Sequence, residues 1–286
     1  IVQGDLADKQ ALGELVSGAA SVIHIAGAIA APTRQVFDAV NVAGTANVAL
    51  AAAEAGVGRF VHLSSMAARE PQLSDYAASK RAGEAALIDA AGAMSWTILR
   101  PPAVYGPGDE ATLPLIAQLT RNHAVLPGAT DNRTSLIHVD DLAAALIMLA
   151  TSTTPRDTVH ELDDGKAGGY SWRELVDIAA RCENRQVKLH HLPRPVMTVA
   201  GYAAKLASMM TGKPAMLTPG KVRELYHPDW VAHDNLLSKA TGWQPAIGFA
   251  EGFAATLDWY RRHQWLPDPG AKARTRNKTD QRETTT

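Results

Sequence analysis

The sequence predicts an α/β protein in which a doubly wound parallel sheet is covered by helices on both faces. Three apolar, strand-like runs support this class, at residues 21–27, 59–65 and 96–100. Helical runs separate them, and this alternation is typical of parallel sheets. The chain has 286 residues, 46% of them hydrophobic, so it can bury a large core.

Helices are expected between and after these strands, at about 34–56, 74–91, 112–121 and 139–150. A further helix should begin at Ser171, because Ser171 and Glu174 have the spacing of a capping box. A strand at 187–192 and a long apolar helix at about 195–210 follow. From Pro267 onward apolar periodicity is lost, which predicts a disordered tail.

Tyr76 and Lys80 carry the strongest indication of chemistry. On a helix they lie one turn apart on the same face. A free phenol titrates near ~10, and a cation about 5 Å away would lower its pKa by roughly two units, into the range of a working acid/base. The alternative is an ordinary exposed helix pair. Ser65 ends the preceding strand and would hydrogen-bond the same substrate oxygen, whereas Ser64 is expected to make a structural strand-end hydrogen bond.

The chain resembles the extended short-chain dehydrogenase/reductases, also called the NAD-dependent epimerase/dehydratase family, from residue 1 to about 265. Seven motifs occur in order: Gly4-Asp5-Leu6, Val22 to Gly27, Asn41 to Asn47, Ser64-Ser65, Tyr76 to Lys80, Arg100 to Gly108, and His138 to Asp141. The resemblance implies a Rossmann-type fold that binds NAD or NADP. It also implies that Tyr76 is the acid/base, that Lys80 orients the ribose and tunes Tyr76, and that Ser65 positions the carbonyl.

The resemblance further implies which residues border the dinucleotide. Asp5 and Leu6 would border the adenine, Ala26 and Gly27 the phosphate and ribose, and the segment from Pro101 to Val104 the nicotinamide. For Asn41 a purely structural role is the alternative. The expected set is Asp5, Leu6, Ala26, Gly27, Asn41, Leu63, Tyr76, Lys80, Pro101, Pro102, Ala103 and Val104.

The amino terminus departs from the family pattern. In the family, a first strand and a Gly-x-x-Gly-x-x-Gly turn precede all the motifs seen here. Ile1 opens on what matches the family's third strand. We therefore expect the full-length protein to begin about 45 to 60 residues earlier and to carry that turn. The residue that selects NAD or NADP would lie in the same segment, so the sequence leaves this preference open.

These observations predict a dinucleotide-binding domain at residues 1–165, a smaller, mostly helical substrate-binding lobe at 166–266 and a disordered tail at 267–286. The net charge of −1 and the isoelectric point near 6.9 give no electrostatic case for binding nucleic acid or an anionic membrane. The apolar run at 142–150 is short for a membrane span. His190 and His191 lack an accompanying carboxylate or thiol cluster, so no metal site is expected.

The single cysteine, Cys182, excludes an internal disulfide and favours a reducing cytoplasm. We expect it to be a small buried hydrophobic residue. The sequence does not determine the oligomeric state, and a homodimer is one possibility.

The expected substrate is a small molecule, an apolar alcohol or ketone, because the lobe is rich in apolar residues. On the helix at 195–210, Val199, Tyr202, Leu206 and Met209 share one face that should point inward, either as a pocket wall or as core packing. The residues expected around the pocket are Leu192, Met197, Val199, Tyr202, Leu206, Met209, Met216 and Leu217.

Two alternatives remain open at this stage. A nucleotide-sugar epimerase or dehydratase is the first; such relatives clamp a diphosphate with an Arg just before the His-Val-x-Asp motif, and Arg133 is displaced from that place by one position. The short interval between Ser65 and Tyr76 also leaves little loop for a sugar subsite. The second alternative is a non-catalytic dinucleotide-binding subunit, for which the set of Ser65, Tyr76 and Lys80 would have no chemical purpose.

Overall fold

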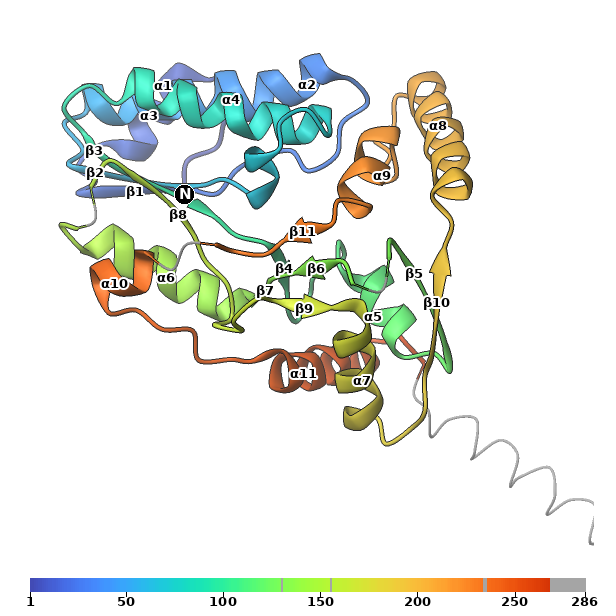
Figure 1. Cartoon of the computed structure of the whole chain (residues 1–286). Helices are drawn as coiled ribbons and strands as arrows, with labels where there is room; N and C mark the ends of the chain where they lie inside the picture. The colour runs from blue at the N-terminus through green and yellow to red at the C-terminus, as the bar shows by residue number, and fades with distance from the viewer. Residues whose placement is uncertain (130, 155, 234–235, 268–286) are drawn as a thin grey trace, which may run out of the picture.

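A computed structural model describes residues 1–267 except 130, 155 and 234–235 (Figure 1). Its centre is a four-stranded parallel sheet in the order β1-β2-β3-β8. The strands are β1 (Ser21–His24), β2 (Arg59–Leu63), β3 (Ser95–Arg100) and β8 (Thr158–Glu161). The first three confirm the strands expected from the sequence, and the α/β fold class is confirmed with them.

Side chains of the central strands alternate between the two faces of the sheet. Phe60 and Ile98 pack on one face, against three helices drawn above the sheet in Figure 1: α1 (Lys9–Val16), α3 (Thr45–Glu54) and α4 (Asp75–Ala90). Val61 and Leu99 pack on the other face, against α6 (Val139–Thr151) and α10 (Leu236–Thr241). Cover on both faces is the reason that these strands read as continuous apolar runs.

The helix expected at 34–56 consists of α2 (Arg34–Asp38), a π-helical turn η1 (Ala39–Gly44) and α3. Within the described part of the chain, the combined run of residues 34–54 is the one helix long and apolar enough to cross a membrane. This run meets the criterion for a membrane span by length and composition alone, and the core helix of a folded domain can meet it too. Val48, Ala49 and Ala52 are buried in the cluster between the sheet and the helices α1, α3 and α4.

Helix ends follow the signals in the sequence. α4 begins after Ser74, whose Oγ accepts a hydrogen bond from the Ala77 amide at 2.9 Å. The capping box at the start of α7 (Trp172–Cys182) is confirmed: Ser171 Oγ accepts from the Glu174 amide at 3.2 Å, and Glu174 accepts from the Ser171 amide at 2.8 Å. These caps satisfy backbone donors that a helix leaves free at its first turn.

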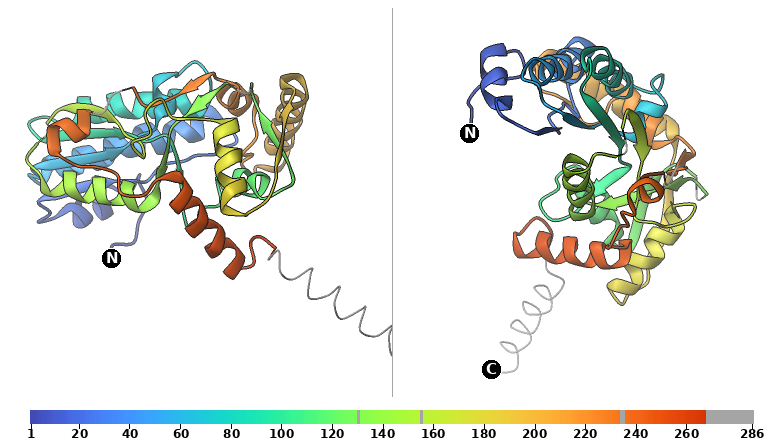
Figure 2. Two further views of the ribbon diagram at one scale, coloured as in Figure 1. Left: turned by 60° about the horizontal axis from the view of Figure 1, so that its bottom comes forward. Right: turned by 90° about the vertical axis from the view of Figure 1, so that its left-hand side faces the viewer.

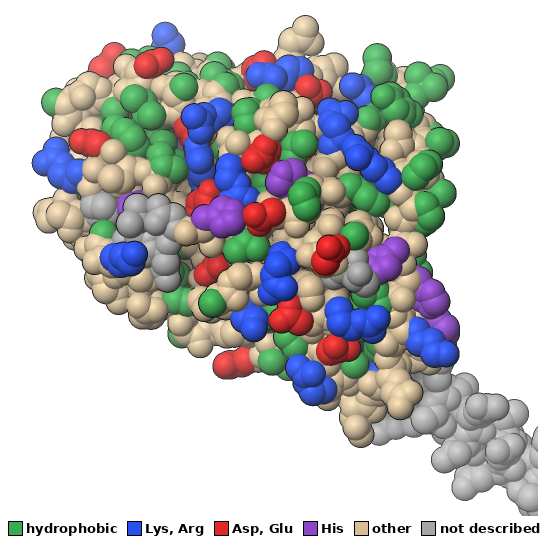
Figure 3. All heavy atoms as spheres, in the orientation of Figure 1, with side chains coloured by type: hydrophobic (Ala, Val, Ile, Leu, Met, Phe, Trp, Pro, Cys, Tyr) green, Lys and Arg blue, Asp and Glu red, His purple; other side chains and the backbone are tan. Residues whose placement is uncertain are grey.

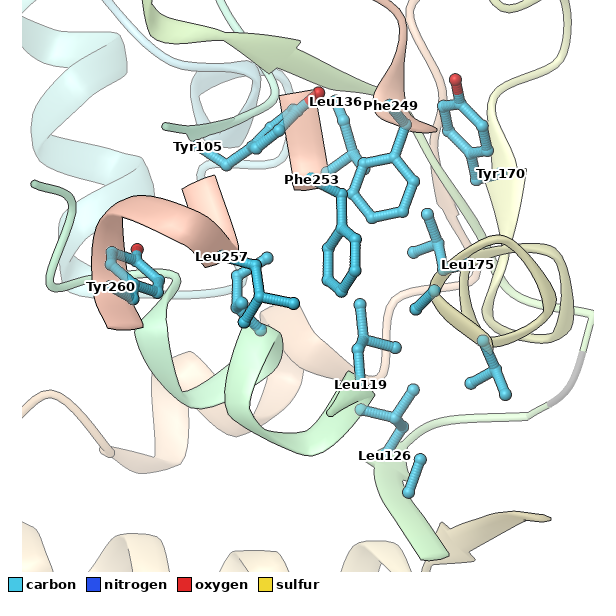
Figure 4. Packing of buried hydrophobic residues seen from close by; sticks show 14 residues of the cluster. Tyr105, Leu119, Leu126, Leu136, Tyr170, Leu175, Phe249, Phe253, Leu257 and Tyr260 are labelled. Atoms are coloured by element: carbon cyan, nitrogen blue, oxygen red, sulfur yellow. The ribbon is translucent and has the colours of Figure 1, made fainter. Parts of the chain in front are cut away.

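The lobe has its own hydrophobic core, shown in Figure 4. Tyr105, Leu126, Phe249 and Phe253 meet there. The helices that supply this core are α5 (Leu113–Leu119), α7 and α11 (Phe249–Arg262). Because α5 precedes residue 165 in the sequence, the lobe core draws on both parts of the chain, and the boundary at residue 165 stays a prediction.

Short strands complete the lobe and join it to the sheet domain. β4 (Ala103–Tyr105) pairs with β7 (Leu136–His138), and β5 (His123–Pro127) pairs with β10 (Lys188–Leu192). β6 (Arg133–Thr134) lies between β9 (Tyr170–Ser171) and β11 (Asp229–Trp230). Arg69, in the 3₁₀ turn η2 (Met66–Arg69), pairs with Glu161 of β8 and donates to the carbonyls of Asp229 and Val231.

The expectation that the apolar stripe of the lobe helix faces inward is wrong. In α8 (Arg194–Thr211), Val199 is 71% exposed, and Tyr202, Leu206 and Met209 are exposed to a similar degree. The opposite side of α8, with Gly201 and Ser208, packs on α9 (Pro219–Leu225). In Figure 1 and in the left view of Figure 2, α8 lies at the edge of the molecule, at the end opposite β1.

Cys182 is exposed, not buried as expected, because it ends α7 at the surface, where its Sγ is 3.7 Å from the carbonyl of Ala250. The predicted tail at 267–286, apart from Pro267, lies outside the described residues.

Two buried histidines should make the stability depend on acid pH. His24 is 4% exposed, and its ring stacks on that of His62 at 5.3 Å. Burial, with a smaller contribution from Lys80, lowers the pKa of His24 to about 4, and burial also lowers the pKa of His62 well below its usual value. The unfolded chain therefore binds more protons between pH 4 and pH 6.5, and stability is lost as pH falls through this window.

We expect His24 alone to lower the free energy of unfolding by about 2 kcal/mol between pH 7 and pH 5. Urea unfolding of the wild type and of His24→Gln at both pH values measures this, since carboxylate titration is common to both proteins. The loss of unfolding free energy between pH 7 and pH 5 should be smaller in the variant than in the wild type. An equal loss in both proteins would contradict the role of His24.

Candidate active site

The candidate site lies at the carboxyl ends of β1 and β2, next to the loop that follows β3. Lys80, on α4, is buried and its Nζ donates a hydrogen bond to the carbonyl of Leu63, the last residue of β2, at 2.7 Å. A Cβ added at Gly27, in the segment after β1, would lie 3.7 Å from Lys80 Nζ. The structure thus brings together Gly27, Leu63 and Lys80, which are far apart in the sequence, as expected for the carboxyl edge of a parallel sheet.

Asn41 holds this arrangement in place. It is 2% exposed, its Oδ1 accepts from the Ala28 amide at 2.7 Å, and its Nδ2 donates to the Ala28 carbonyl and to Ser79 Oγ. One buried side chain therefore fastens the loop after β1 to the residue that precedes Lys80. This supports the structural alternative for Asn41, which lies in the π-helical turn η1, a distortion frequent at functional sites.

The electrostatics of Tyr76 differ from the expectation. Burial raises the pKa of Tyr76, while an interaction with the Ser65 side chain and the charge of Lys221 lower it. The cation that lowers it is Lys221 of the lobe, whereas the Lys80 ammonium donates to the Leu63 carbonyl. Burial also lowers the pKa of Lys80 to about 8, against an opposing effect of Glu84. Ser65 and Tyr76 do meet as predicted, but the expected lowering of the Tyr76 pKa by Lys80 is wrong.

Ser64 has the structural role expected of it. Its Oγ donates to Glu84 Oε1 at 2.5 Å, and Glu84 forms a two-pronged ion pair with Arg100. This network joins the end of β2, the middle of α4 and the end of β3. Ser65 instead caps the turn η2, accepting from the Ala67 amide at 3.1 Å.

The sequence did not single out Lys221, which comes from α9 in the lobe. Lys221 Nζ lies 2.9 Å from Glu224 Oε2, and Glu224 Oε1 accepts from Ser74, the residue that caps α4 two positions before Tyr76. Burial disfavours the Lys221 ammonium, but the attraction and hydrogen bond of Glu224 outweigh it, so the pKa of Lys221 is raised. A Lys and Glu three residues apart are too common on helices to have signalled this role.

A pocket joins Tyr76 to the lobe. Its walls combine apolar and charged side chains, including Ile29, Phe37, Tyr202, Lys205, Met216 and Lys221. Of the apolar residues that the sequence assigned to a pocket, Tyr202 and Met216 contribute. Leu192, Met197, Val199, Leu206, Met209 and Leu217 are not among the lining residues.

Several of the residues expected to border the dinucleotide lie in the segments that follow β1 and β3 or in the turn before α1. Ala26, Gly27 and Ala103 are exposed there, and the Pro101 carbonyl accepts from the Met66 amide at 2.9 Å. Asp5 lies in the turn before α1, where its Oδ1 accepts from the amides of Ala7 and Asp8. A side chain at Gly27 would crowd Asn41 Oδ1 at 3.2 Å, so glycine keeps open backbone beside the Lys80 ammonium. Open backbone beside the Lys80 ammonium fits a bound dinucleotide.

The other polar residues noted in the sequence have structural contacts. His138 is 3% exposed and caps α6, and Asp141 accepts from the amides of Ala246 and Ile247 of the lobe. His190 lies 2.9 Å from His123, while His191 contacts the Gly128 carbonyl. Among the described residues no group of three His, Cys, Asp or Glu side chains is arranged to hold a metal ion.

Comparisons with known proteins identify the family of the chain. A sequence model of the NAD dependent epimerase/dehydratase family matches residues 1–160. The chain is 43% identical over 268 residues to a ceramide reductase of Caulobacter vibrioides, covering 93% of this chain and 82% of that protein. It is 30% identical over 175 residues to a 2-alkyl-3-oxoalkanoate reductase of Stenotrophomonas maltophilia, covering 54% of this chain and 53% of that protein.

Among solved structures, the fold matches MoeE5 in complex with UDP-glucose and NAD, with a TM-score of 0.70 and 20% identity, covering 92% of this chain and 86% of that chain. The family match includes the segment with Tyr76 and Lys80. The two relatives named above are both reductases. The chain therefore belongs to the NAD-dependent epimerase/dehydratase family and is an NAD(P)-dependent oxidoreductase of the short-chain dehydrogenase/reductase type.

Proposed function

We propose that this oxidoreductase reduces the ketone of an amphiphilic substrate to an alcohol, with Tyr76 as the proton donor. The observation that carries the proposal is the pocket in which Tyr76 lies between apolar side chains, such as Phe37 and Met216, and the Lys221 ammonium. Such a pocket suits a polar, carbonyl-bearing head attached to an apolar body. The substrate is then apolar in its chains and polar at the reacting centre.

Tyr76 is suited to give up a proton in this direction. Because burial raises its pKa, the phenol is protonated at neutral pH. When bound, a reduced nicotinamide would supply the hydride that the carbonyl carbon accepts. Tyr76 gives its proton to the carbonyl oxygen, which becomes the alcohol, while the Ser65 hydroxyl holds that oxygen in line. Lys80, on the Leu63 carbonyl and beside Gly27, is the group that would hold the ribose.

Lys221, on α9 of the lobe, places an ammonium group in the wall of the pocket. Glu224 fixes it through a 2.9 Å contact and is itself held by Ser74 at the start of α4. We assign to Lys221 the binding of a polar group next to the reacting carbonyl. The names of the two reductase relatives support a substrate with alkyl chains and such polar groups, since they specify a ceramide and a 2-alkyl-3-oxoalkanoate.

A nucleotide-sugar epimerase is the alternative favoured by MoeE5, whose structure contains UDP-glucose. The contacts of Arg133 argue against it here. This guanidinium donates to the carbonyls of Gly168 and Gly169 and pairs with Glu174 at 3.2 Å, so it is bound to the lobe's own loop. A non-catalytic role would leave the set of Ser65, Tyr76 and Lys80 without a chemical purpose. A cytoplasmic location, resting on the single cysteine, and a homodimer stay predictions.

The test compares three compounds with the full-length protein: an N-acylated long-chain 3-oxo amine, a 2-alkyl-3-oxoalkanoate and UDP-glucose. Net oxidation of NADH or NADPH with either ketone supports the proposal. Conversion of UDP-glucose without net cofactor turnover would replace it with the epimerase. Cofactor binding without conversion of any compound would favour the non-catalytic subunit.

Replacing Tyr76 with Phe removes the proton donor and keeps the ring. We expect kcat to fall by about two to four decades, the usual size of a general acid contribution, with the Kd of the dinucleotide nearly unchanged. Steady-state rates and dinucleotide titration measure both quantities. Tyr202→Phe, a second tyrosine of the same pocket, serves as the control. Retention of more than about a tenth of wild-type kcat in Tyr76→Phe would remove Tyr76 from this role.

Lys221→Met should raise KM for the ketone by about ten-fold or more, because a charge-assisted contact with the substrate is lost, while the Kd of the dinucleotide stays the same. Lys221→Arg keeps the charge, so its KM for the ketone should stay close to the wild-type value. If KM is unchanged in a variant with a wild-type melting temperature, Lys221 does not bind the substrate.

A further inference from the structure

The outward side of α8 carries an exposed apolar surface, which we call the α8 face. Val199, Leu206 and Met210 are 71%, 60% and 80% exposed. Figure 3 shows hydrophobic side chains gathered at the upper right of the molecule, over α8. The face consists of Val196, Val199, Tyr202, Leu206, Met209 and Met210. Contiguous exposed apolar surface of this kind marks an interaction site.

The packing of α8 on α9 fixes which side points outward. Gly201 is buried, and a Cβ there would lie 3.1 Å from the Thr218 carbonyl carbon and 3.2 Å from Val222 Cγ2. Ser208, on the same side, donates to the Lys213 carbonyl at 2.6 Å. The helix is held by its small residues, so the apolar side chains cannot turn into the lobe core without breaking this contact.

The stretch of sequence that contains α8 is rich in cations, although the whole chain has a net charge of only −1. Residues 185–223 contain seven Lys and Arg residues and no Asp or Glu: Arg185, Lys188, Arg194, Lys205, Lys213, Lys221 and Arg223. Lys188, Arg194, Lys205, Lys213 and Arg223 are exposed. Arg194 and Lys205 are eleven residues apart, about three turns, so they flank the face on the same side. The average charge of the chain conceals this local concentration.

The α8 face is continuous with the pocket. Tyr202 belongs to the face and lines the pocket, and Lys205, on the flank, lines it as well. The pocket volume of 190 Å³ is below the roughly 300 Å³ at which pockets enclose a whole drug-sized ligand. A substrate with long alkyl chains would place its head beside Tyr76 and leave its chains along α8.

We propose that the α8 face docks on an anionic phospholipid bilayer, with its apolar side chains inserted among the acyl chains and the flanking Lys and Arg residues against lipid phosphates. An exposed apolar stripe bordered by basic residues is the pattern of helices that lie in the membrane interface. Docking would turn the mouth of the pocket toward the bilayer. An amphiphilic substrate would enter the pocket from there. A second copy of the chain fits the face less well, because a symmetric contact would bring the exposed cations Arg194 and Lys205 of one copy toward those of the other.

The proposal extends the proposed function to the source of the substrate, but its test does not need turnover. The full-length protein is sedimented with vesicles of phosphatidylcholine alone and of phosphatidylcholine mixed with phosphatidylglycerol. We expect it to pellet with the mixed vesicles and to be released by high salt, since salt screens the attraction to anionic lipid.

Leu206→Glu combined with Met210→Glu should weaken binding to the mixed vesicles by at least about ten-fold, because two inserted apolar side chains become anionic. Ile147→Glu on α6, at a site with 61% exposure and outside the face, is the matched control and should bind as the wild type does. Arg194→Glu with Lys213→Glu should weaken binding without altering the apolar side chains.

Activity separates this proposal from the proposed function. Neither Leu206 nor Met210 lines the pocket, so the double variant should keep wild-type rates on a short-chain, water-soluble ketone and lose rate on a ketone lipid embedded in vesicles. Absence of wild-type binding to the mixed vesicles, or equal binding by the double variant, overturns docking even if the reductase activity stands. A dimer that the double variant abolishes, seen by sedimentation velocity without lipid, would assign the face to a second copy instead.

Discussion

The parallel register of the central strands is the constraint on which the candidate site depends. Ser21 pairs with Arg59 and Arg59 with Ser95, so β1, β2 and β3 begin level with one another. Strands that begin level and run in the same direction also end at one edge, and the segments that follow them meet there. This is why Gly27 and the Leu63 carbonyl both lie beside Lys80. An antiparallel neighbour would have carried one of these segments to the opposite edge.

The lobe completes the site by acting on the helix that carries Tyr76. Ser74 has two roles at the start of α4, since its hydroxyl accepts from the Ala77 amide and donates to Glu224. The same Glu224 holds Lys221, whose charge reaches Tyr76. The position of the lobe is therefore coupled to the electrostatics of the proposed acid. In the sheet domain itself, the Lys80 ammonium donates to the Leu63 carbonyl. The cation that lowers the pKa of Tyr76 is Lys221, which is 145 positions away in the sequence (221 − 76).

Polar and apolar surfaces are divided in a way that suits an amphiphile. Lys221 and Glu224 are the charged pocket residues that act on Tyr76, and the apolar side chains of α8 continue from the pocket over the surface. Arg133, the residue that would have suggested a diphosphate, is bound to Gly168, Gly169 and Glu174. These contacts support the proposed lipid-like ketone rather than a nucleotide sugar, and they depend on where side chains point.

Much of the molecule could be predicted because it follows from local patterns. The strands at β1, β2 and β3, the helix of Tyr76 and Lys80, the capping box at Ser171 and the family itself were all legible in the sequence, since each rests on the periodicity or spacing of neighbouring residues. The structural role of Ser64, as the hydroxyl at the end of a strand, belongs to the same class.

The tertiary structure alone decided the rest, because it depends on which surfaces meet. The spacing of Val199, Tyr202, Leu206 and Met209 showed that they share a side of α8, but not which side would be buried. That choice was made by Gly201, whose lack of a side chain allows α8 to approach Thr218 and Val222 of the neighbouring segment, leaving the larger apolar side chains outside. The contact of Lys221 with the environment of Tyr76 likewise arises from the docking of two parts of the chain, and local sequence carries no record of such a contact.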